Sequence, residues 1–567
     1  GVLKRMRGKS GGSLGQIMNK NGELLTEPAD IADRWGEYFS ELLEAHESEE
    51  TPNDHRSNYT TIRDEDISIQ DVTAAIRKLK NGKAAGIDEI KAEWLKYMGP
   101  SAIKYFCNIM NEAWKQKRIP EDWSTAVITP IFKKGDRKRC SNYRGISILS
   151  VPGKVYESLL EKKLRDSIEN SLHDAQSGFR PGHSVQDHIF TIKQLTEKFL
   201  KHNRELYICF IDMEKAFDKV PRKCIWEALR ISEVEPGLIE AIKSTYKSSW
   251  NIVRTLNCES RRFGTTQGVR QGGVLSPLLF LIFMNGIINK CSAQSQRTEA
   301  GYHRLRSIKV SECIFADDIA LIASSEQALQ TNLNIWAREL SVNGMTINLD
   351  KTKALVISNS PKEINLLLNG NKVEQVKEYE YLGVKIDEEG KLQKELDSRI
   401  AKTTKLYHSL KKGFINKKEV SKKTKITIYK TVYFPTLLYG CETWTPTERQ
   451  KHKIQTVEMK YLRRVQGVTI MDKIKNETIR NNLNVESANS VIERSQLRWF
   501  GHLNRMNQDR QVKKIWEARE YGKVRKGRPR KRWNDVISEA LQRRGITWPE
   551  AKQTALNRKQ WRELIRK

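Results

Sequence analysis

Residues 313–322 read Cys-Ile-Phe-Ala-Asp-Asp-Ile-Ala-Leu-Ile, so two adjacent acids, Asp317 and Asp318, interrupt an apolar run. Residues that favour β-strands on both sides of a short turn predict a hairpin that is buried on at least one face. Burying an ionised carboxylate costs several kcal/mol unless something pairs with it. A divalent cation that prefers oxygen ligands, such as Mg²⁺, is the simplest partner for clustered carboxylates.

A third acid, Asp212, directly follows another apolar run, Tyr-Ile-Cys-Phe-Ile at 207–211. Taken alone, an Asp-Asp pair is more commonly a turn cap than a catalytic site. An acid at a strand end, followed later by a hairpin with two more acids, is instead typical of a two-metal phosphoryl-transfer centre. The order strand, hairpin, helix (about 325–342) and strand (353–358) predicts an antiparallel sheet with helices on one face.

Further motifs occur in a fixed order around these acids. They are Asn-Tyr-Arg-Gly-Ile-Ser (142–147), Gln-Ser-Gly-Phe-Arg-Pro-Gly (176–182), Gln-Gly-Val-Arg-Gln-Gly-Gly-Val-Leu-Ser-Pro (267–277), Asn348 with Lys351-Thr352, and Tyr-Leu-Gly (381–383). With Phe-Ala-Asp-Asp after Asp-x-x-x-Ala-Phe-Asp, this set resembles the reverse transcriptases of non-LTR retrotransposons, and their RTE-like members in particular. The resemblance is strong from Ala84 to Ile386 and weaker towards the C-terminus.

The resemblance implies an α+β fold, a right-hand polymerase with fingers, a palm with an antiparallel sheet, and a helical thumb, followed by a helical basic C-terminal region. We expect an N-terminal helical extension over 1–60 and a helical region before the fingers over 61–125. The fingers and palm should span 126–386 and the thumb 387–478. A separate basic region that binds nucleic acid should span 479–567.

The resemblance also assigns roles in nucleotidyl transfer. Asp212 and Asp317 would bridge two Mg²⁺ ions, or Mn²⁺, and Asp318 would be the supporting carboxylate. Lys351 would protonate or neutralise the pyrophosphate leaving group, unless it forms only a structural ion pair. Phe217 would lie under the incoming sugar and exclude a 2′-OH, unless it is only a core aromatic.

Other residues are expected to contact the nucleotide, the template or the primer. Arginine forks suit phosphate oxygens, so Arg144, with Lys133 and Lys134, would contact the triphosphate or the template, and a solvated basic loop is the alternative. Gln271 would touch the nascent base pair, because the glycines beside it allow close backbone approach. The remaining expected template and primer contacts are Gly178, Arg180, Gly272, Ser276, Tyr381 and Gly383.

The composition points to a polyanionic partner. The 567 residues carry 100 Lys and Arg against 69 Asp and Glu, a net charge of +31, on an apolar fraction of 38%. This balance predicts a folded protein with a basic surface that binds nucleic acid. The eight cysteines form no Cys-x-x-Cys pair, so we predict no zinc site. We see no apolar run approaching a bilayer span and predict no membrane contact.

The densest basic run lies at 523–533 and contains Gly-Arg-Pro-Arg. This motif resembles an AT-hook, whose arginines enter a narrow minor groove, but a nuclear import signal or a plain phosphate-binding arm are alternatives. Rings among basic residues can stack on unpaired bases, although core packing is at least as common. The residues expected to bind DNA or RNA in this region are Arg498, Trp499, Arg525, Lys526, Arg528, Arg530 and Arg532.

The leading interpretation is an RNA-directed DNA polymerase that extends a nicked target-DNA primer with dNTPs on its own element RNA. RTE-like proteins carry an endonuclease upstream. This chain lacks those motifs and starts at Gly1, so we expect that domain to be missing from it. We expect a nuclear location during integration and a cytoplasmic ribonucleoprotein before it. The alternatives are a catalytically inactive or domesticated nucleic-acid-binding protein, and a maturase or RNA polymerase, which Phe217 and the lack of Cys pairs disfavour.

Overall fold

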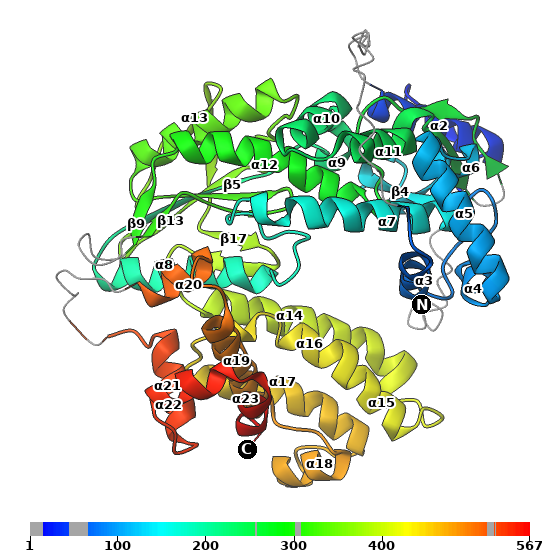
Figure 1. Cartoon of the computed structure of the whole chain (residues 1–567). Coiled ribbons are helices and arrows are strands. Elements are labelled where there is room, and N and C mark those ends of the chain that lie inside the picture. Colours follow the sequence, from blue (N-terminus) through cyan, green and yellow to red (C-terminus); the bar gives the residue numbers. More distant parts are fainter. Residues whose placement is uncertain are drawn as a thin grey trace.

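The computed structural model describes residues 15–44, 66–255, 258–300, 308–518, 527 and 529–566. Figure 1 shows two layers, with the strands and the first half of the helices above and a bundle of later helices below. The chain passes from the upper to the lower layer after the strand β18 (Val384–Asp387), where α14 (Gln393–Leu410) begins. This arrangement matches the palm and fingers above a helical thumb.

The palm is built on a five-stranded sheet in the order β11-β12-β5-β13-β16. Its strands pair antiparallel except for β13 and the short β16, which run parallel. The predicted hairpin and the strand before Asp212 are both present, as β11–β12 and β5. The strand bounds are Leu206–Ile211 (β5), Glu312–Phe315 (β11), Asp318–Ala323 (β12), Lys353–Ile357 (β13) and Glu374–Gln375 (β16).

Both faces of this sheet are covered, so the prediction of helices on one face is wrong. Along β5, Cys209 and Ile211 belong to the cluster that includes α12 (Ser276–Gln294) and α13 (Glu326–Val342). The alternate residues Ile208 and Phe210 belong to a second cluster, with α8 (Val185–Lys201) and the hairpin of β17 (Glu378–Tyr381) and β18. All six residues of β5 are buried, because a strand covered on both faces needs a continuous apolar sequence.

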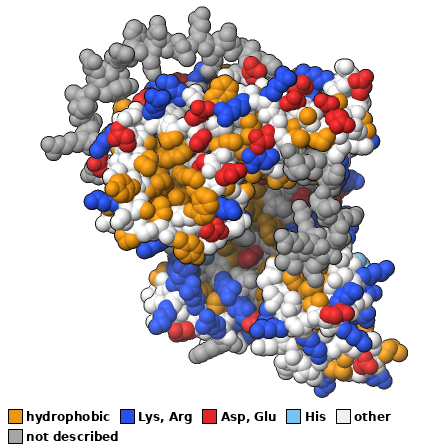
Figure 2. All heavy atoms as spheres, turned by 90° about the vertical axis from the view of Figure 1, so that its right-hand side faces the viewer, with side chains coloured by type: hydrophobic (Ala, Val, Ile, Leu, Met, Phe, Trp, Pro, Cys, Tyr) orange, Lys and Arg blue, Asp and Glu red, His pale blue; other side chains and the backbone are white. Residues whose placement is uncertain are grey.

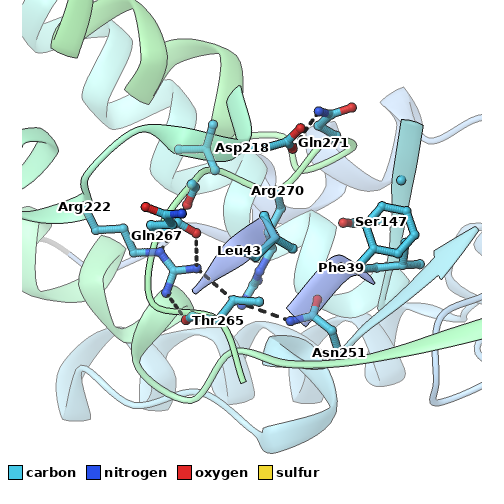
Figure 3. Close-up of a pocket in the computed structure, with 14 residues that line it drawn as sticks. Phe39, Leu43, Ser147, Asp218, Arg222, Asn251, Thr265, Gln267, Arg270 and Gln271 are labelled. Carbon is cyan, nitrogen blue, oxygen red and sulfur yellow. Dashed lines mark hydrogen bonds between the residues drawn. The ribbon is translucent and has the colours of Figure 1, made fainter. Parts of the chain in front are cut away.

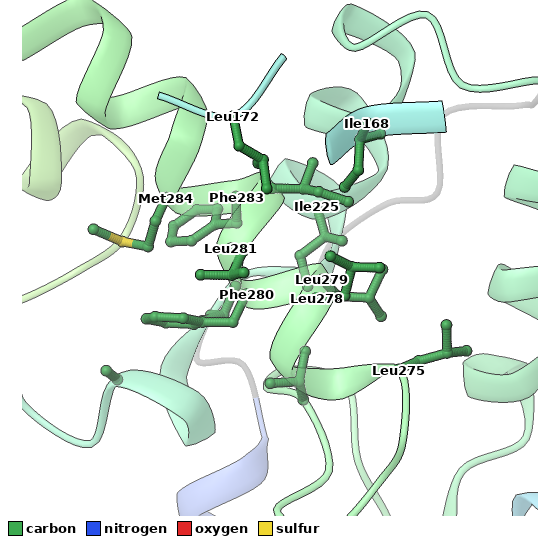
Figure 4. Close-up of a cluster of buried hydrophobic side chains, with 14 of the residues drawn as sticks. Ile168, Leu172, Ile225, Leu275, Leu278, Leu279, Phe280, Leu281, Phe283 and Met284 are labelled. Atoms are coloured by element: carbon green, nitrogen blue, oxygen red, sulfur yellow. The ribbon is translucent and has the colours of Figure 1, made fainter. Parts of the chain in front are cut away.

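The helix α12 forms the centre of the larger core. Its apolar residues pack against Ile168, the last residue of α7 (Val151–Ile168), and against Leu172 and Ile225 (Figure 4). By length and mean hydropathy (1.2) it could cross a membrane, so the prediction that no apolar run approaches this length is wrong. However, 72% of the helix is buried inside the protein, as expected for a core helix.

The fingers contain a second sheet, in the order β4-β3-β6-β7, with β8 paired to β6. The N-terminal helix α2 (Pro28–Leu43) packs on it, with Trp35 at 4.9 Å from the ring of Tyr143. The strands are β3 (Ala126–Phe132), β4 (Tyr143–Leu149), β6 (Trp250–Thr255), β7 (Cys258–Glu259) and β8 (Phe263–Gly264). Helices α3 (Ile69–Lys78), α4 (Ala92–Lys96) and α5 (Pro100–Gln116) lie beyond it (Figure 1).

The lower layer begins with the thumb helices. A buried cluster of tyrosines that includes Tyr429, Tyr433 and Tyr461 holds them together. Turns of π-helix at 411–415 and 429–433 adjoin α14 and α15. The helices are α14, α15 (Lys422–Ile428), α16 (Phe434–Leu437), α17 (Glu448–Gln466) and α18 (Asn476–Leu483).

The C-terminal helices pack onto the palm and thumb instead of forming a separate unit. The ring of Trp533 lies 4.8 Å from that of Phe190 on α8, and its Nε1 donates to the carbonyl of Glu442 at 2.8 Å. Arg510 forms an ion pair with the buried Asp187 of α8. The helices are α19 (Ala488–Arg505), α20 (Gln511–Glu517), α21 (Trp533–Gln542), α22 (Trp548–Leu556) and α23 (Arg558–Leu564).

Candidate active site

The antiparallel palm sheet brings the three predicted acids together. In the β11–β12 hairpin Phe315 pairs with Asp318, which leaves Ala316 and Asp317 as a two-residue turn. The strand β12 pairs with β5 so that Ile319 faces Ile211. One step further along this register, Asp318 lies opposite Asp212. Residues more than 100 positions apart in the sequence therefore meet at one end of the sheet.

The turn itself is in an unusual backbone conformation. Ala316 has a φ of +59°, in the left-handed region that costs a non-glycine residue about 1–3 kcal/mol. Such strain persists only where the surrounding structure holds it, and it is common at functional sites. The strain lies directly before the first of the two acids.

The carboxylates repel one another. The pKa of Asp318 is raised to about 6, mainly by desolvation and in addition by the negative charges of Asp317 and Asp212. The pKa of Asp317 is also raised, first by desolvation and then by Asp212. The negative charge of Asp212 thus raises the pKa of both hairpin acids, and a cation at this concentration of negative charge would relieve the repulsion. This electrostatic arrangement is typical of a metal-binding or catalytic site.

Asp212 is held by the segment that carries the predicted Lys351. The Nζ of Lys351 lies 2.9 Å from Oδ2 of Asp212. The main-chain carbonyl of Asp212 accepts from the amide of Asn348 at 2.8 Å, and its amide donates to Thr352 Oγ1 at 3.3 Å. Lys351 therefore does form an ion pair, but with Asp212, the predicted catalytic acid, so it lies beside the predicted metal-binding carboxylates.

The acids suit a divalent ion by their chemistry. Carboxylate oxygens are the ligands that Mg²⁺ and Mn²⁺ prefer, and the charges of Asp317 and Asp212 raise the pKa of Asp318, which a bound cation would counteract. Lys351 forms an ion pair with Oδ2 of Asp212, one of the oxygens that could bind such an ion. Within the described part of the chain, His, Cys, Asp and Glu side chains nowhere converge in threes as a preformed metal cluster.

Positive charge faces the acids from the fingers. Arg144, exposed on β4, lowers the pKa of both Asp317 and Asp318. The pKa of Lys133 is lowered by desolvation and by the charges of Arg144 and Lys351, with a smaller effect from its neighbour Lys134. The predicted phosphate-binding residues thus lie close enough to the carboxylates to interact with them electrostatically.

Phe217 lies on the short helix α9 (Ala216–Lys219) directly after the Asp212 loop. Its half-buried ring stacks on Phe280 of α12, with ring centroids 4.5 Å apart and planes at 15°. The edge of Phe179 contacts it at 6.2 Å. Contacts on two sides fix the ring. A fixed ring fits both a sugar gate and a core aromatic, so the role of Phe217 as the sugar gate stays a prediction.

Gln271 is bound to Asp218, an acid for which the sequence predicts no role. Its Nε2 donates to Asp218 Oδ1 at 2.7 Å (Figure 3). Desolvation raises the pKa of Asp218 to about 6, against the stabilising effect of Gln271. Asp218 lies on the same helix as Phe217. Its only signal in the sequence is its place in the Asp-x-x-x-Ala-Phe-Asp motif.

The loop that carries Gln271 is packed against the fingers strand β4. The amide of Ser147 donates to the carbonyl of Gln271 at 2.8 Å. Gly272 has a φ of +127°, and a Cβ there would lie 2.5 Å from the carbonyl oxygen of Ser147. Close backbone approach to the fingers therefore requires a glycine at 272, and the contact of Gly272 with template or primer stays a prediction. A small pocket beside it is lined by Arg222, Thr265 and Asn251 among others (Figure 3).

Several residues predicted to contact template or primer are buried by the protein itself. Arg180 is 7% exposed, and it binds Glu169 Oε1 (3.1 Å) and the carbonyl of His173 (3.0 Å). Gly178 is buried against Ala316. Ser276 is 2% exposed with its Oγ 3.2 Å from the hydroxyl of Tyr246. These three predictions of direct nucleic-acid contact are wrong.

The Tyr-Leu-Gly motif forms the tip of the hairpin β17 (Glu378–Tyr381) and β18. Tyr381 is buried beneath the sheet, 5.2 Å from the ring of Phe210, so its predicted contact with the primer is wrong. Gly383 has a φ of +81° in the turn, and its carbonyl accepts from Arg399 of α14. The hairpin therefore joins the palm to the thumb. Contact of Gly383 with a primer stays a prediction.

The predicted nucleic-acid contacts of the C-terminal region have mixed outcomes. Trp499 is buried against Phe190 at 5.6 Å, so its ring cannot stack on a base. Arg498 is exposed. Arg530 donates to the carbonyl of Glu389 at 2.6 Å and Arg532 pairs with Asp535 at 2.8 Å, so both have structural partners. The remaining predicted residues, Arg525, Lys526 and Arg528, lie outside the described residues.

Comparisons with known proteins agree with this geometry. Residues 131–386 match the family described as reverse transcriptase (RNA-dependent DNA polymerase). The probable RNA-directed DNA polymerase from transposon BS of Drosophila melanogaster is 27% identical over 77% of this chain and 49% of its own length. The RNA-directed DNA polymerase from mobile element jockey of Drosophila funebris is 26% identical over 71% and 44%.

The Pol polyprotein from the type-2 retrotransposable element R2DM of Drosophila melanogaster is 26% identical over 58% of this chain and 31% of its own length. The chain thus spans half or less of the length of these curated relatives. Enzymes of the matched family generally use divalent metal ions. The matched domain, the relatives and the three palm acids agree: residues 131–386 match the reverse transcriptase family, and the chain is similar to the RNA-directed DNA polymerases of non-LTR retrotransposons.

Proposed function

We propose that this chain extends a DNA primer with deoxynucleotides on an RNA template. The observation that carries the proposal is the register of the palm sheet, which sets Asp212 beside the Asp317–Asp318 turn. Basic residues of the fingers face these acids, and an aromatic ring lies on the helix next to them. A nucleotidyl transferase needs these three elements together: carboxylates for the ions, cations for the phosphates and a wall for the sugar.

The carboxylates and the lysine would act together in the chemistry. Asp212, Asp317 and Asp318 would hold divalent ions, Mg²⁺ or Mn²⁺, which activate the primer hydroxyl and neutralise the triphosphate when bound. The ammonium group of Lys351, 2.9 Å from Oδ2 of Asp212, would neutralise or protonate the pyrophosphate as it leaves.

The other residues of the site would select and orient the substrate. Arg144 and Lys133 would bind phosphate oxygens of the nucleotide or template, since they already face the acids. Phe217 would exclude a nucleotide with a 2′-OH, because its ring is fixed by Phe280 and cannot easily move aside. Gln271 would present its amide to the nascent pair while Asp218 orients it.

The natural template would be the element's own RNA and the primer a nicked target DNA. The resemblance to non-LTR elements supports this assignment, together with the net charge of +31. The nick would be made by an endonuclease domain encoded upstream of this chain. The protein would act in the nucleus during integration and form a cytoplasmic ribonucleoprotein before it.

Primer extension tests the proposal. The chain is incubated with a DNA primer on an RNA template, Mg²⁺ and dNTPs, beside Asp317→Asn and Asp318→Asn, which keep the side-chain size and remove the charges. We expect extension by the wild type, and loss of extension in both variants with retained template binding. If the wild type binds RNA but does not extend the primer, a nucleic-acid-binding protein without catalysis is the correct interpretation.

A further inference from the structure

The segment 175–179 lies directly against the catalytic turn. The amide of Ser177 donates to the carbonyl of Ile314, and the amide of Ile314 donates to the carbonyl of Ala175, both at 2.9 Å. A Cβ on Gly178 would lie 2.4 Å from the amide nitrogen of Ala316. Only a glycine therefore lets the segment pack this closely. These contacts form a short parallel bridge beside β11, which leads into the turn.

Within this segment, Gln176 binds the strained residue of the turn. Its side chain is fully buried. Its Oε1 accepts from the amide of Ala316 at 2.9 Å and from the amide of Gly178 at 2.8 Å. Its Nε2 donates to the carbonyl of Ala316 at 3.4 Å. One amide side chain thus contacts both main-chain polar groups of the residue that precedes Asp317.

The main chain of Gln176 is itself held in place. Its main-chain carbonyl accepts from Arg180 Nη1 at 3.2 Å, and Arg180 is fixed by Glu169. On the other side of Gly178, the ring of Phe179 contacts the predicted sugar gate, Phe217. The segment therefore touches both the metal-binding turn and the nucleotide side of the site. This explains why Arg180 is buried in a network and does not face solvent.

We propose that Gln176 is a positioning residue for the metal-binding carboxylates. By binding Ala316, it holds the turn in its left-handed conformation, so that Asp317 and Asp318 stay beside Asp212. The inference rests on the proposed function, since it concerns the same carboxylates. Without these hydrogen bonds the turn would relax from its strained backbone, and the acids would spread over several conformations. Divalent ions would then bind more weakly.

The test replaces Gln176 with Met, which has a similar volume but lacks the amide. The matched control is Gln496→Met. Gln496 is also buried (2% exposed), and its Nε2 donates to the carbonyl of Trp444 at 2.8 Å. It lies on α19, which contributes no residue to the site. Both variants lose one buried amide, so both should lose stability, but only one loses contact with the catalytic turn.

Three quantities separate positioning from a general structural role. They are the affinity for Mn²⁺ measured by electron paramagnetic resonance without substrate, the Mg²⁺ concentration at half-maximal extension, and the melting temperature. For Gln176→Met we expect Mn²⁺ affinity to fall roughly 10-fold and the half-maximal Mg²⁺ concentration to rise, as for other residues that orient metal ligands. Gln496→Met should lower the melting temperature alone.

The proposal is overturned if Gln176→Met binds Mn²⁺ as tightly as Gln496→Met does. The Mn²⁺ measurement needs no turnover, so it decides the role of Gln176 even if the wild type fails to extend a primer and the proposed function is wrong. If Gln176→Met does not fold, Gln176→Asn replaces it under the same criteria. Asn keeps an amide in the core but is one methylene too short to keep both contacts with Ala316.

Discussion

When they are ionised, the individual acids of this site destabilise the folded chain. Asp318 and Asp218 both have a pKa of about 6, and in both cases desolvation is the main cause. An acid whose pKa rises on folding favours the unfolded state once it is ionised. Such groups are retained where function needs them, because repulsion between carboxylates is what gives a site its affinity for cations.

This trade-off predicts that Asp318→Asn stabilises the protein while abolishing extension. The penalty from ionised Asp318 grows as pH rises from the unfolded value of 3.8 to about 6 and stays constant above that. The difference between these two pKa values corresponds to about 3 kcal/mol of unfolding free energy. Because the side chain is exposed, solvent screening reduces this to about 1 kcal/mol. Urea unfolding without metal should therefore show the gain at pH 8 and none at pH 4. An equal gain at both pH values would contradict the electrostatic explanation.

The sugar gate is tested by Phe217→Val. A smaller side chain leaves room for a 2′-OH, so the preference for dNTPs over rNTPs should fall by roughly 10- to 100-fold, the range that one steric contact commonly supplies. The measured quantity is the ratio of the two kcat/KM values, so a general loss of activity cancels. An unchanged ratio would show that Phe217 serves only to pack against Phe280.

At the scale of elements, the sequence predicts where strands and helices form better than it predicts which of their faces are buried. The hairpin forms around Asp317 and Asp318 as predicted, and α13 and β13 lie within a residue of the bounds predicted for them (325–342 and 353–358), because apolar runs and acidic turns are local signals. The second covered face of the sheet was missed, since α8 and β17–β18 reach it from distant parts of the chain.

The same limit explains the wrong site residues. Arg180, Tyr381 and Trp499 are of types that often bind nucleic acid, but each is buried by tertiary contacts that no local pattern records. The three acids were predicted correctly as a group because their chemistry requires them to meet. Gln176 gives no such signal, since a single Gln in a loop is ordinary.

The docking of α20 on α8 depends on a buried ion pair, which predicts a large effect for Arg510→Ala. Asp187 is 4% exposed, and desolvation raises its pKa against the effect of Arg510. Removing Arg510 leaves a buried charge and should cost about 3–5 kcal/mol at pH 7 by urea unfolding. Below the raised pKa the carboxyl is neutral, so the loss should shrink in acid.

The control for this pair is Lys115→Ala. Lys115 lies 3.0 Å from Asp66, but both side chains are more than half exposed. Its loss should cost less than about 1 kcal/mol. If Arg510→Ala costs no more than Lys115→Ala, then the apolar contacts of α20 dock the C-terminal region and the ion pair does not.

At the scale of the whole molecule, the thumb is tied to the palm at both of its ends. Before it, the β17–β18 turn is bound by Arg399 and by Tyr439, whose hydroxyl donates to the carbonyl of Leu382 at 3.0 Å. After it, the C-terminal helices return to α8. The surface view shows a hollow between the upper and lower parts of the protein, with Lys and Arg side chains gathered on the lower part (Figure 2).

This charge distribution predicts that the thumb contributes to phosphate binding. Residues 411–430 contain eight lysines and one acid, and Lys422 and Lys423 at the start of α15 are exposed. Each phosphate contact releases a counterion, so log Kd for a primer–template duplex varies with log salt by about 0.9 per contact. Replacing both lysines with Gln should lower this slope by about 2. The same change at Lys372 and Lys377, exposed on the palm, serves as the control. A specific groove on the thumb would respond only to the lysines that line it. If the double replacements on the thumb and on the palm lower the slope equally, then net charge and not the thumb surface determines binding.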